Sequence, residues 1–146
     1  MRQSPGRQLI FLCVLISLSG CDRHGGLSES LVRHFENKQI RIVPLRVSQS
    51  PWSRSGYVIV EHSPEKVAQI IKTFGLRSMD ADASDAAQRD FILRDAGLEK
   101  DRFTEAWGLF GRPSEFRLSG GGQLEYFILL VSSDGFMYLL AEYAYG

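Results

Sequence analysis

The chain has 146 residues and a mass of 16.4 kDa, which is the size of one ordinary domain. Hydrophobic residues make up 44% of it and charged residues 23%, values typical of a folded protein and not of a disordered one. Seventeen basic residues balance seventeen acidic ones, and the first twenty residues contribute two arginines and no acid. Binding of nucleic acid through a basic face is therefore not expected, because neutralising phosphates requires clustered Lys and Arg.

The N-terminal segment has the organisation of an export signal. Residues 1–8 carry Arg2 and Arg7, and residues 9–18 form an apolar run interrupted by Ser17 alone. Ten residues rise only about 15 Å as a helix, which is half the thickness of a bilayer core. A basic stretch followed by a short apolar run is typical of a secretory signal peptide.

The tetrapeptide Leu18-Ser19-Gly20-Cys21 follows this run, where an ordinary signal peptide would have an Ala-x-Ala site. It resembles the lipobox of bacterial lipoproteins, in which an aliphatic residue, a small residue and Gly or Ala precede a cysteine. The resemblance implies cleavage between Gly20 and Cys21, diacylglycerol on the Cys21 Sγ and acylation of the new amine. It also implies a cell-envelope location with the lipids in the membrane. The alternative is an ordinary signal peptide or short anchor helix in which Cys21 is incidental.

Asp22 directly follows the cysteine that the resemblance assigns to lipid. Aspartate at this position resembles the signal that retains lipoproteins of enteric bacteria in the inner membrane. The expected location is therefore the periplasmic face of the inner membrane, with the outer membrane as the alternative.

The expected domain organisation follows from the same assignment. Residues 1–20 are the signal peptide, residues 21–27 the lipidated cysteine with a short tether, and residues 28–146 the folded domain. Cys13 leaves with the signal peptide, so a mature domain would have no free thiol, no disulfide and no cysteine-based metal site. Five or six extended residues reach at most about 20 Å, so the domain would lie close to the lipid headgroups.

Helices are predicted at four places in the domain. Ser28 begins a helix that ends near Asn37 and carries His34 on a solvated flank. Ser63-Pro64-Glu65 begins a second helix that ends at Gly75. Asp82 or Ser84 caps a third helix that ends at Gly97, and the spacing of Phe103, Ala106, Trp107 and Phe110 predicts a fourth, with Trp107 in the core.

Strands are predicted mainly at the C-terminus. Residues 39–47 form an edge or bulged strand because Pro44 cannot donate a ladder hydrogen bond, and residues 57–62 form the next strand. A short strand at 114–119 is followed by strands at 123–131 and 136–146, with a hairpin turn at 132–135. Because the last two strands are apolar on both faces, both faces must be covered. The fold class is α+β: a single small domain with an antiparallel meander at the C-terminus and helices packed on the sheet.

Catalytic and metal sites find little support in the sequence. Asp80, Asp82 and Asp85 resemble the start of a calcium loop, but Asp85 stands where the loop needs glycine and Phe91 where it needs a bidentate glutamate. His24, His34 and His62 lack the neighbours of a metal motif, and the glycines at 120–122 lack the lysine of a phosphate loop. Neither a cofactor nor a metal is therefore expected.

The leading interpretation is a lipid-anchored, non-enzymatic module that binds another envelope protein. It would be an accessory component of an envelope machine, or an inhibitor such as an immunity protein against a toxin. Trp52, Arg46 and Arg54 are the candidate partner-binding residues, because aromatic and arginine side chains are enriched at interfaces. Trp52 alternatively rests at the membrane interface or folds back onto the sheet.

Two other interpretations remain open. One is a small periplasmic hydrolase whose acid–base pair is assembled from distant residues such as His62 with Glu61 or Asp134. The other is a carrier of a small ligand that uses the doubly apolar sheet.

Overall fold

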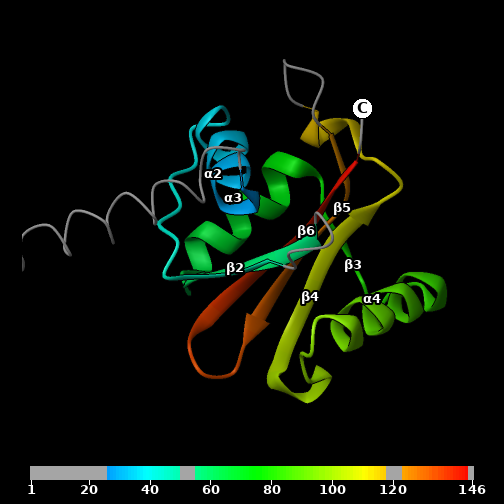
Figure 1. Ribbon diagram of the computed structural model, residues 1–146. Coiled ribbons are helices and arrows are strands. Elements are labelled where there is room, and N and C mark those ends of the chain that lie inside the picture. Colours follow the sequence, from blue (N-terminus) through cyan, green and yellow to red (C-terminus); the bar gives the residue numbers. More distant parts are fainter. Residues whose placement is uncertain (1–25, 50–54, 118–122, 145–146) are drawn as a thin grey trace, which may run out of the picture.

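The computed structural model describes residues 26–49, 55–117 and 123–144, and the segments that hold Gly20, Cys21, Asp22, Trp52 and Arg54 lie outside these ranges. A six-stranded antiparallel sheet runs through the molecule in the order β1-β2-β6-β5-β4-β3 (Figure 1). Its strands are β1 (Arg46–Gln49), β2 (Ser55–Glu61), β3 (Arg77–Ser78), β4 (Phe103–Phe110), β5 (Gln123–Ser132) and β6 (Phe136–Ala144).

Helices cover the sheet from both sides. Helices α2 (Leu27–Glu36) and α3 (Pro64–Phe74) lie on one face, and α4 (Ala83–Asp95) lies on the other (Figure 1). Two short 3₁₀ turns, η1 (Lys100–Arg102) and η2 (Ser114–Phe116), flank β4. The α+β fold, the antiparallel C-terminal meander and the packing of helices on the sheet are confirmed, but the third strand of the meander is β4 and not the short strand expected at residues 114–119.

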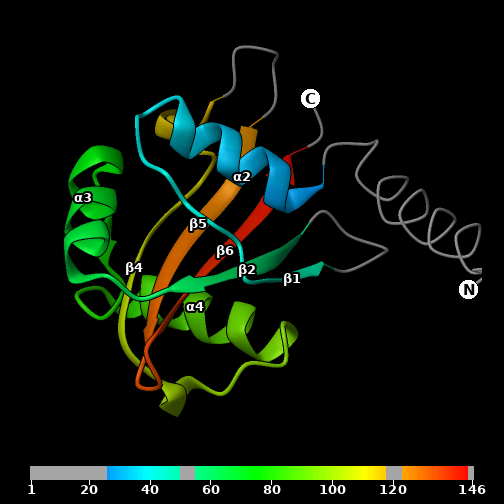
Figure 2. The ribbon, with the colours of Figure 1, turned by 90° about the vertical axis from the view of Figure 1, so that its left-hand side faces the viewer.

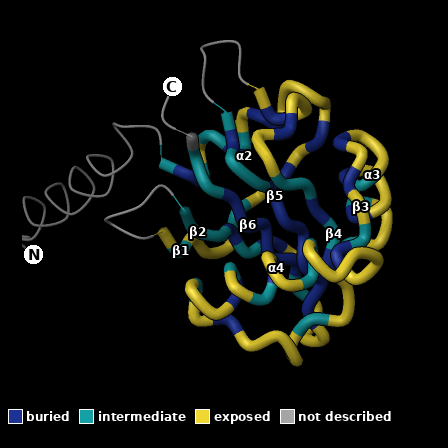
Figure 3. The backbone as a smooth tube through the Cα atoms, turned by 90° about the vertical axis from the view of Figure 1, so that its right-hand side faces the viewer, coloured by how far each residue is buried: buried dark blue, intermediate teal, exposed yellow. Residues whose placement is uncertain are grey.

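The two central strands are buried on both faces, as their apolar pattern predicts. Phe127 and Leu129 of β5 belong to the core under α2 and α3, whereas Ile128 and Leu130 belong to the core under α4. Figure 3 shows this as a dark blue path along β5 and β6. On the α2 face, four phenylalanines pack ring against ring with centroids 4.4 to 6.4 Å apart, namely Phe35, Phe74, Phe116 and Phe127.

The predicted caps of α3 and α4 are confirmed, whereas Ser28 does not cap the first helix, because α2 already begins at Leu27 after Gly26. Ser63 Oγ accepts a hydrogen bond from the Lys66 amide at 3.3 Å, and Gly75 ends α3 at a φ of 62°. Asp82 Oδ1 accepts from the Ser84 and Asp85 amides at 2.7 and 3.2 Å and so begins α4. The hairpin turn at 132–135 also forms, with Gly135 at a φ of 91°.

The helix predicted at 103–110 is wrong, because this segment is the strand β4. Its apolar residues match helical spacing by coincidence, since the strand contacts helices on both faces and so has no simple alternation. Gly108 permits the close approach of β4 to β5, since a Cβ at this position would lie 2.5 Å from the Phe127 carbonyl oxygen. Trp107 is half-buried against the α2 face and not fully enclosed.

Two predicted strands are shorter than expected. Within residues 39–47, only Arg46 and Val47 belong to β1 and pair with β2. The residues before them, which include Pro44, lead to the sheet but do not join its ladder of paired residues. The segment 114–119 forms η2 and one isolated bridge between Arg117 and Gln123 in its described part. The connector at 77–85 contains the two-residue strand β3, which the sequence pattern does not reveal.

Candidate functional site

A groove runs along α4, between this helix and the sheet. Of the residues of α4, Arg89 and Leu93 are buried, while Phe91 is 64% exposed. The loose packing leaves two adjoining hollows of about 480 and 300 Å³ that share Ile92 and Tyr126, and we call them together the α4 groove. The larger is also lined by Ala87, Gln88, Phe91, Phe110, Gly111 and Glu125, and the smaller by Ser48, Gln49, Ser55, Gly56, Tyr57, Asp95, Ala96 and Leu140.

The register of the sheet explains which side chains form the floor of the α4 groove. Ser55 of β2 lies opposite Glu142 of β6, Glu142 opposite Tyr126 of β5, and Tyr126 opposite Phe110 of β4. Directly opposed residues share a face, so these four side chains form a row across four strands. The rings of Phe110 and Tyr126 are 6.3 Å apart between centroids. The floor therefore changes from polar to aromatic along its length.

The middle of the α4 groove is acidic. Burial raises the pKa of the Tyr126 hydroxyl, and the negative charges of Glu142 and Asp95 raise it further. Among the described residues, neither Glu142 nor Asp95 forms an ion pair, whereas Glu125 is held by Arg112 at 2.9 Å. The groove thus combines exposed aromatic surface with the uncompensated carboxylate of Asp95, and Glu142 lies opposite Tyr126 on the same face of the sheet.

Of the predicted partner-binding residues, Arg46 belongs to β1, the strand whose Ser48 and Gln49 line one end of the α4 groove. Gln49 and Ser55, which line the groove, flank the segment that carries Trp52 and Arg54. Arg46 is exposed on β1 opposite Ile59, a residue of the core under α4, and so belongs to the groove side of the sheet. The positions of Trp52 and Arg54 lie outside the described residues.

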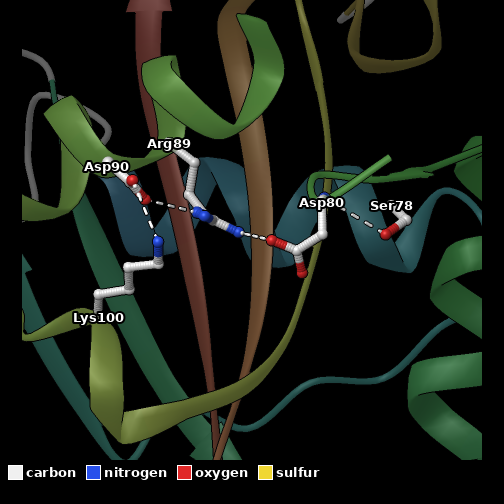
Figure 4. Close-up of polar contacts among 5 residues, drawn as sticks. All are labelled: Ser78, Asp80, Arg89, Asp90 and Lys100. Carbon is white, nitrogen blue, oxygen red and sulfur yellow. Dashed lines mark hydrogen bonds and ion pairs between the residues drawn. The ribbon is translucent and has the colours of Figure 1, made fainter. Parts of the chain in front are cut away.

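A buried arginine holds α4 to the rest of the molecule (Figure 4). The Arg89 side chain is 5% exposed; its Nη1 donates to Asp80 Oδ1, and its Nε donates to Asp90 Oδ1 at 2.9 Å. Lys100 Nζ donates to the other oxygen of Asp90 at 3.3 Å. Burial would lower the pKa of Arg89, but hydrogen bonds and charges from the two aspartates outweigh burial and raise it.

The charged side chains around Arg89 hold the fold together and do not form a ligand site. The hollow beside it, of about 290 Å³, is lined by Arg89 and Lys100 but also by Asp80, Asp101 and Glu105, so it does not favour an anion. The acidic run that resembles a calcium loop has comparable structural roles: Asp80 pairs with Arg89, Asp82 caps α4, and Asp85 lies 3.5 Å from Arg77.

The two described histidines, His34 and His62, do not form a candidate active site. His34 is buried, contrary to the prediction, and His62 forms no acid–base pair. His34 is 4% exposed and lies edge-on to Phe116, so its predicted place on a solvated flank is wrong. His34 lies three residues after Leu31 and seven after Leu27, so it shares the face of α2 that packs on the core, whereas Arg33 is exposed. Burial lowers the pKa of His34 to about 4.

The hydrolase pair is not assembled among the described side chains. His62 reaches the β5–β6 turn through its main chain, whose amide donates to the Gly135 carbonyl at 3.1 Å. Asp134 in that turn instead accepts from Ser132 Oγ and lies 3.7 Å from Arg102, and Glu61 is exposed at the end of β2.

The α4 groove is the feature that sequence reasoning missed. The nearest signal is the helical stretch Phe91-Ile92-Leu93, in which three adjacent apolar residues cannot all face the core. In the part of the chain that the structure describes, no group of His, Cys, Asp or Glu is arranged to hold a metal ion. No helix within those same ranges is long and apolar enough to cross a bilayer. Comparisons of the chain with protein-family models, curated proteins and solved structures find no match.

Proposed function

We propose that the protein is a lipid-anchored envelope lipoprotein that acts as a non-enzymatic protein-binding module, with the α4 groove as its contact surface. In this proposal, cleavage between Gly20 and Cys21 precedes lipidation of Cys21, and Asp22 retains the protein on the periplasmic face of the inner membrane. The partner is another envelope protein, either a component of a machine or a toxin that the module inhibits.

The observation that carries the proposal is the composition of the α4 groove. Surfaces that bind proteins combine exposed aromatic anchors with a polar rim. Phe91 is 64% exposed beside Phe110 and Tyr126, and Asp95 stands unpaired on the rim. A monomer that needed α4 for stability alone would gain from turning Phe91 inward. Trp52, Arg46 and Arg54 extend the contact surface beyond the hairpin end of the groove.

The anchor would place this groove near the membrane. The Leu27 amide, at the start of α2, donates to Gln49 Oε1 at 3.1 Å, so the first described turn contacts the hairpin end of the groove. Five residues lie between Cys21 and Leu27, and this connection spans at most about 20 Å. A partner seated in the groove would therefore be one that is embedded in the membrane or works close to it.

A carrier of a small ligand would use the same surface. A hollow of about 480 Å³ has the volume of a ligand site. Such sites enclose most of their ligand, however, and here the largest aromatic wall, Phe91, projects from the rim. The open shape favours a polypeptide.

Site-specific photo-crosslinking tests the proposed surface. A benzophenone analogue of phenylalanine at position 91 is irradiated in membranes and compared with the same analogue at Lys72, an exposed position of α3 on the opposite face. We expect a discrete protein adduct from position 91 and none from position 72. Asp95→Lys should weaken that adduct, whereas Glu65→Lys, which reverses an exposed charge on α3, should not.

Adducts of equal yield at positions 91 and 72, or none at position 91, would remove the α4 groove as the contact surface. Trp52→Ala and Arg54→Gln test the extension of that surface in the same assay. An adduct that survives both changes would confine the contact to the groove.

A further inference from the structure

The edge of the sheet formed by β1 and the residues before it carries exposed aliphatic side chains. Val43 and Leu45 are each 57% exposed and Val47 is 43% exposed. These are three of the four large hydrophobic side chains that are exposed in the part of the chain that the structure describes. Edge strands of soluble domains usually carry charges in such places, because an apolar edge invites association. We therefore expect another molecule to cover this edge of the sheet.

The same edge is basic. From residue 37 to residue 60 the sequence contains Lys38, Arg41, Arg46 and Arg54 and no acid. Within the described residues, the exposed Arg41 and Arg46 form no ion pair, and Lys66 adds a third positive charge by donating through Nζ to the Arg41 carbonyl. Glu61 is the first acidic residue after this stretch, and it lies past the residues of β2 that pair with β1.

The root of the tether lies at one end of this edge. Gln49, the last residue of β1, accepts the hydrogen bond from the Leu27 amide at 3.1 Å. Figure 2 shows the start of α2 beside the β1–β2 hairpin. At about 3.3 Å per extended residue, Val43 lies about 20 Å from Gln49. A lipid on Cys21 would hold the whole edge within reach of the headgroups.

We infer that this edge, comprising Arg41, Val43, Leu45, Arg46 and Val47, rests on a bilayer surface that contains anionic lipid. The inference relies on the lipid anchor of the proposed function but not on the α4 groove. The aliphatic side chains enter the headgroup region, and the arginines pair with lipid phosphates. A strand of another protein is a less suitable occupant, because β1 is four residues long and Pro44 cannot donate to a ladder.

Fluorescence from a single introduced cysteine tests this contact. Cys13 and Cys21 are the cysteines of the sequence, so in the lipidated mature protein an added cysteine is the sole thiol. Leu45→Cys and, as the matched control, Phe91→Cys at a position of similar exposure are labelled with an environment-sensitive dye. Each protein is reconstituted in phosphatidylcholine vesicles with or without phosphatidylglycerol and with a doxyl-lipid quencher. Mass spectrometry first verifies the acyl chains on Cys21, so failure of the anchor is recognised separately.

We expect the dye at position 45 to shift to the blue and to be quenched when phosphatidylglycerol is present, and the dye at position 91 to remain in water. Arg41→Gln and Arg46→Gln should each reduce the docked population about fivefold. Arg94→Gln, which removes an exposed charge from α4, should leave it unchanged.

Equal signals at positions 45 and 91, or a signal at position 45 that ignores phosphatidylglycerol, would overturn the inference. Energy transfer between copies labelled at position 45 would instead identify a second copy of the chain as the occupant and would also overturn it. Crosslinking at position 91 tests the proposed function independently of each result.

Discussion

His34 lies on α2 with its ring edge against Phe116, and its Nε2 has no hydrogen-bond partner among the described residues. A buried imidazole without a partner is tolerated while it is neutral and becomes costly when it is charged. Burial lowers its pKa from 6.5 to about 4, so the folded protein holds this side chain neutral at ordinary pH. At the scale of single residues, this histidine makes the fold sensitive to acid.

We expect the stability of the protein to fall as the pH decreases from 6.5 towards 4. Between these values the unfolded state binds more protons than the folded state, so the stabilisation is complete above pH 6.5 and lost as the pH falls through 4. The slope from this group is at most about 1.4 kcal/mol per pH unit. Urea unfolding of His34→Leu across this range should give a flatter pH profile than the unsubstituted protein.

Lys38→Gln provides the control for that prediction, because it changes an exposed side chain just after the same helix and leaves His34 in place. It should preserve the original slope. Parallel profiles for His34→Leu and the unsubstituted protein would show that His34 is not the acid-sensitive group.

At the scale of elements, the three helices are attached to the sheet in different ways. α3 inserts Val67, Ile70 and Phe74 into the core, whereas α4 inserts Leu93 and is held by the ion pairs of Arg89. Arg89 binds Asp80 in the turn after β3, and its neighbour Asp90 binds Lys100 of η1 (Figure 4). Local attachment of this kind permits α4 to open without unfolding the whole domain.

We expect Arg89→Met to loosen α4 selectively. Methionine retains the apolar stem but loses both ion pairs, at a cost of about 1–2 kcal/mol. Hydrogen exchange should accelerate in α4 and in the turn at 79–82, while α3 keeps its protection. Arg94→Met, an exposed change on the same helix, should leave all rates unaltered; uniform acceleration in both helices would refute local attachment.

At the scale of the whole molecule, three features converge at the β1–β2 hairpin. The first turn of α2, the β1 edge and the smaller hollow of the α4 groove all contact Gln49 or belong to its strand. A lipid six residues before Leu27 would bring this end of the domain to the membrane surface. Anchor, membrane contact and partner surface would then act from one end of a small domain.

Cys21→Ser tests the anchor on which this arrangement depends. We expect loss of the acyl mass, retention of the signal segment and weaker membrane association, because in the proposed function the lipid on Cys21 and the acyl chain on its amine would supply the binding energy. Mass spectrometry and carbonate extraction of membranes measure the two effects. Cys13→Ser, a change in the signal segment, should leave the acylated product intact, and an unchanged mass for Cys21→Ser would contradict lipidation.

The sequence by itself determined the elements whose signals are local. Ser63, Gly75, Asp82 and Gly135 specify caps and turns through their own backbone and side-chain chemistry, so these boundaries could be predicted. The doubly apolar pattern of residues 123–131 likewise predicted a covered central strand.

Only the tertiary structure decided the features that depend on distant neighbours. β4 is a strand because it pairs with β5 along residues 103–110, and spacing within these residues cannot show this pairing. His34 shares a helix face with Leu31, but only the fold brings its ring against Phe116, far along the chain. The α4 groove exists because β2, β6, β5 and β4 place Ser55, Glu142, Tyr126 and Phe110 in one row. Register and packing bring together residues whose proximity no local sequence pattern predicts. For that reason the candidate site could not be predicted from the sequence.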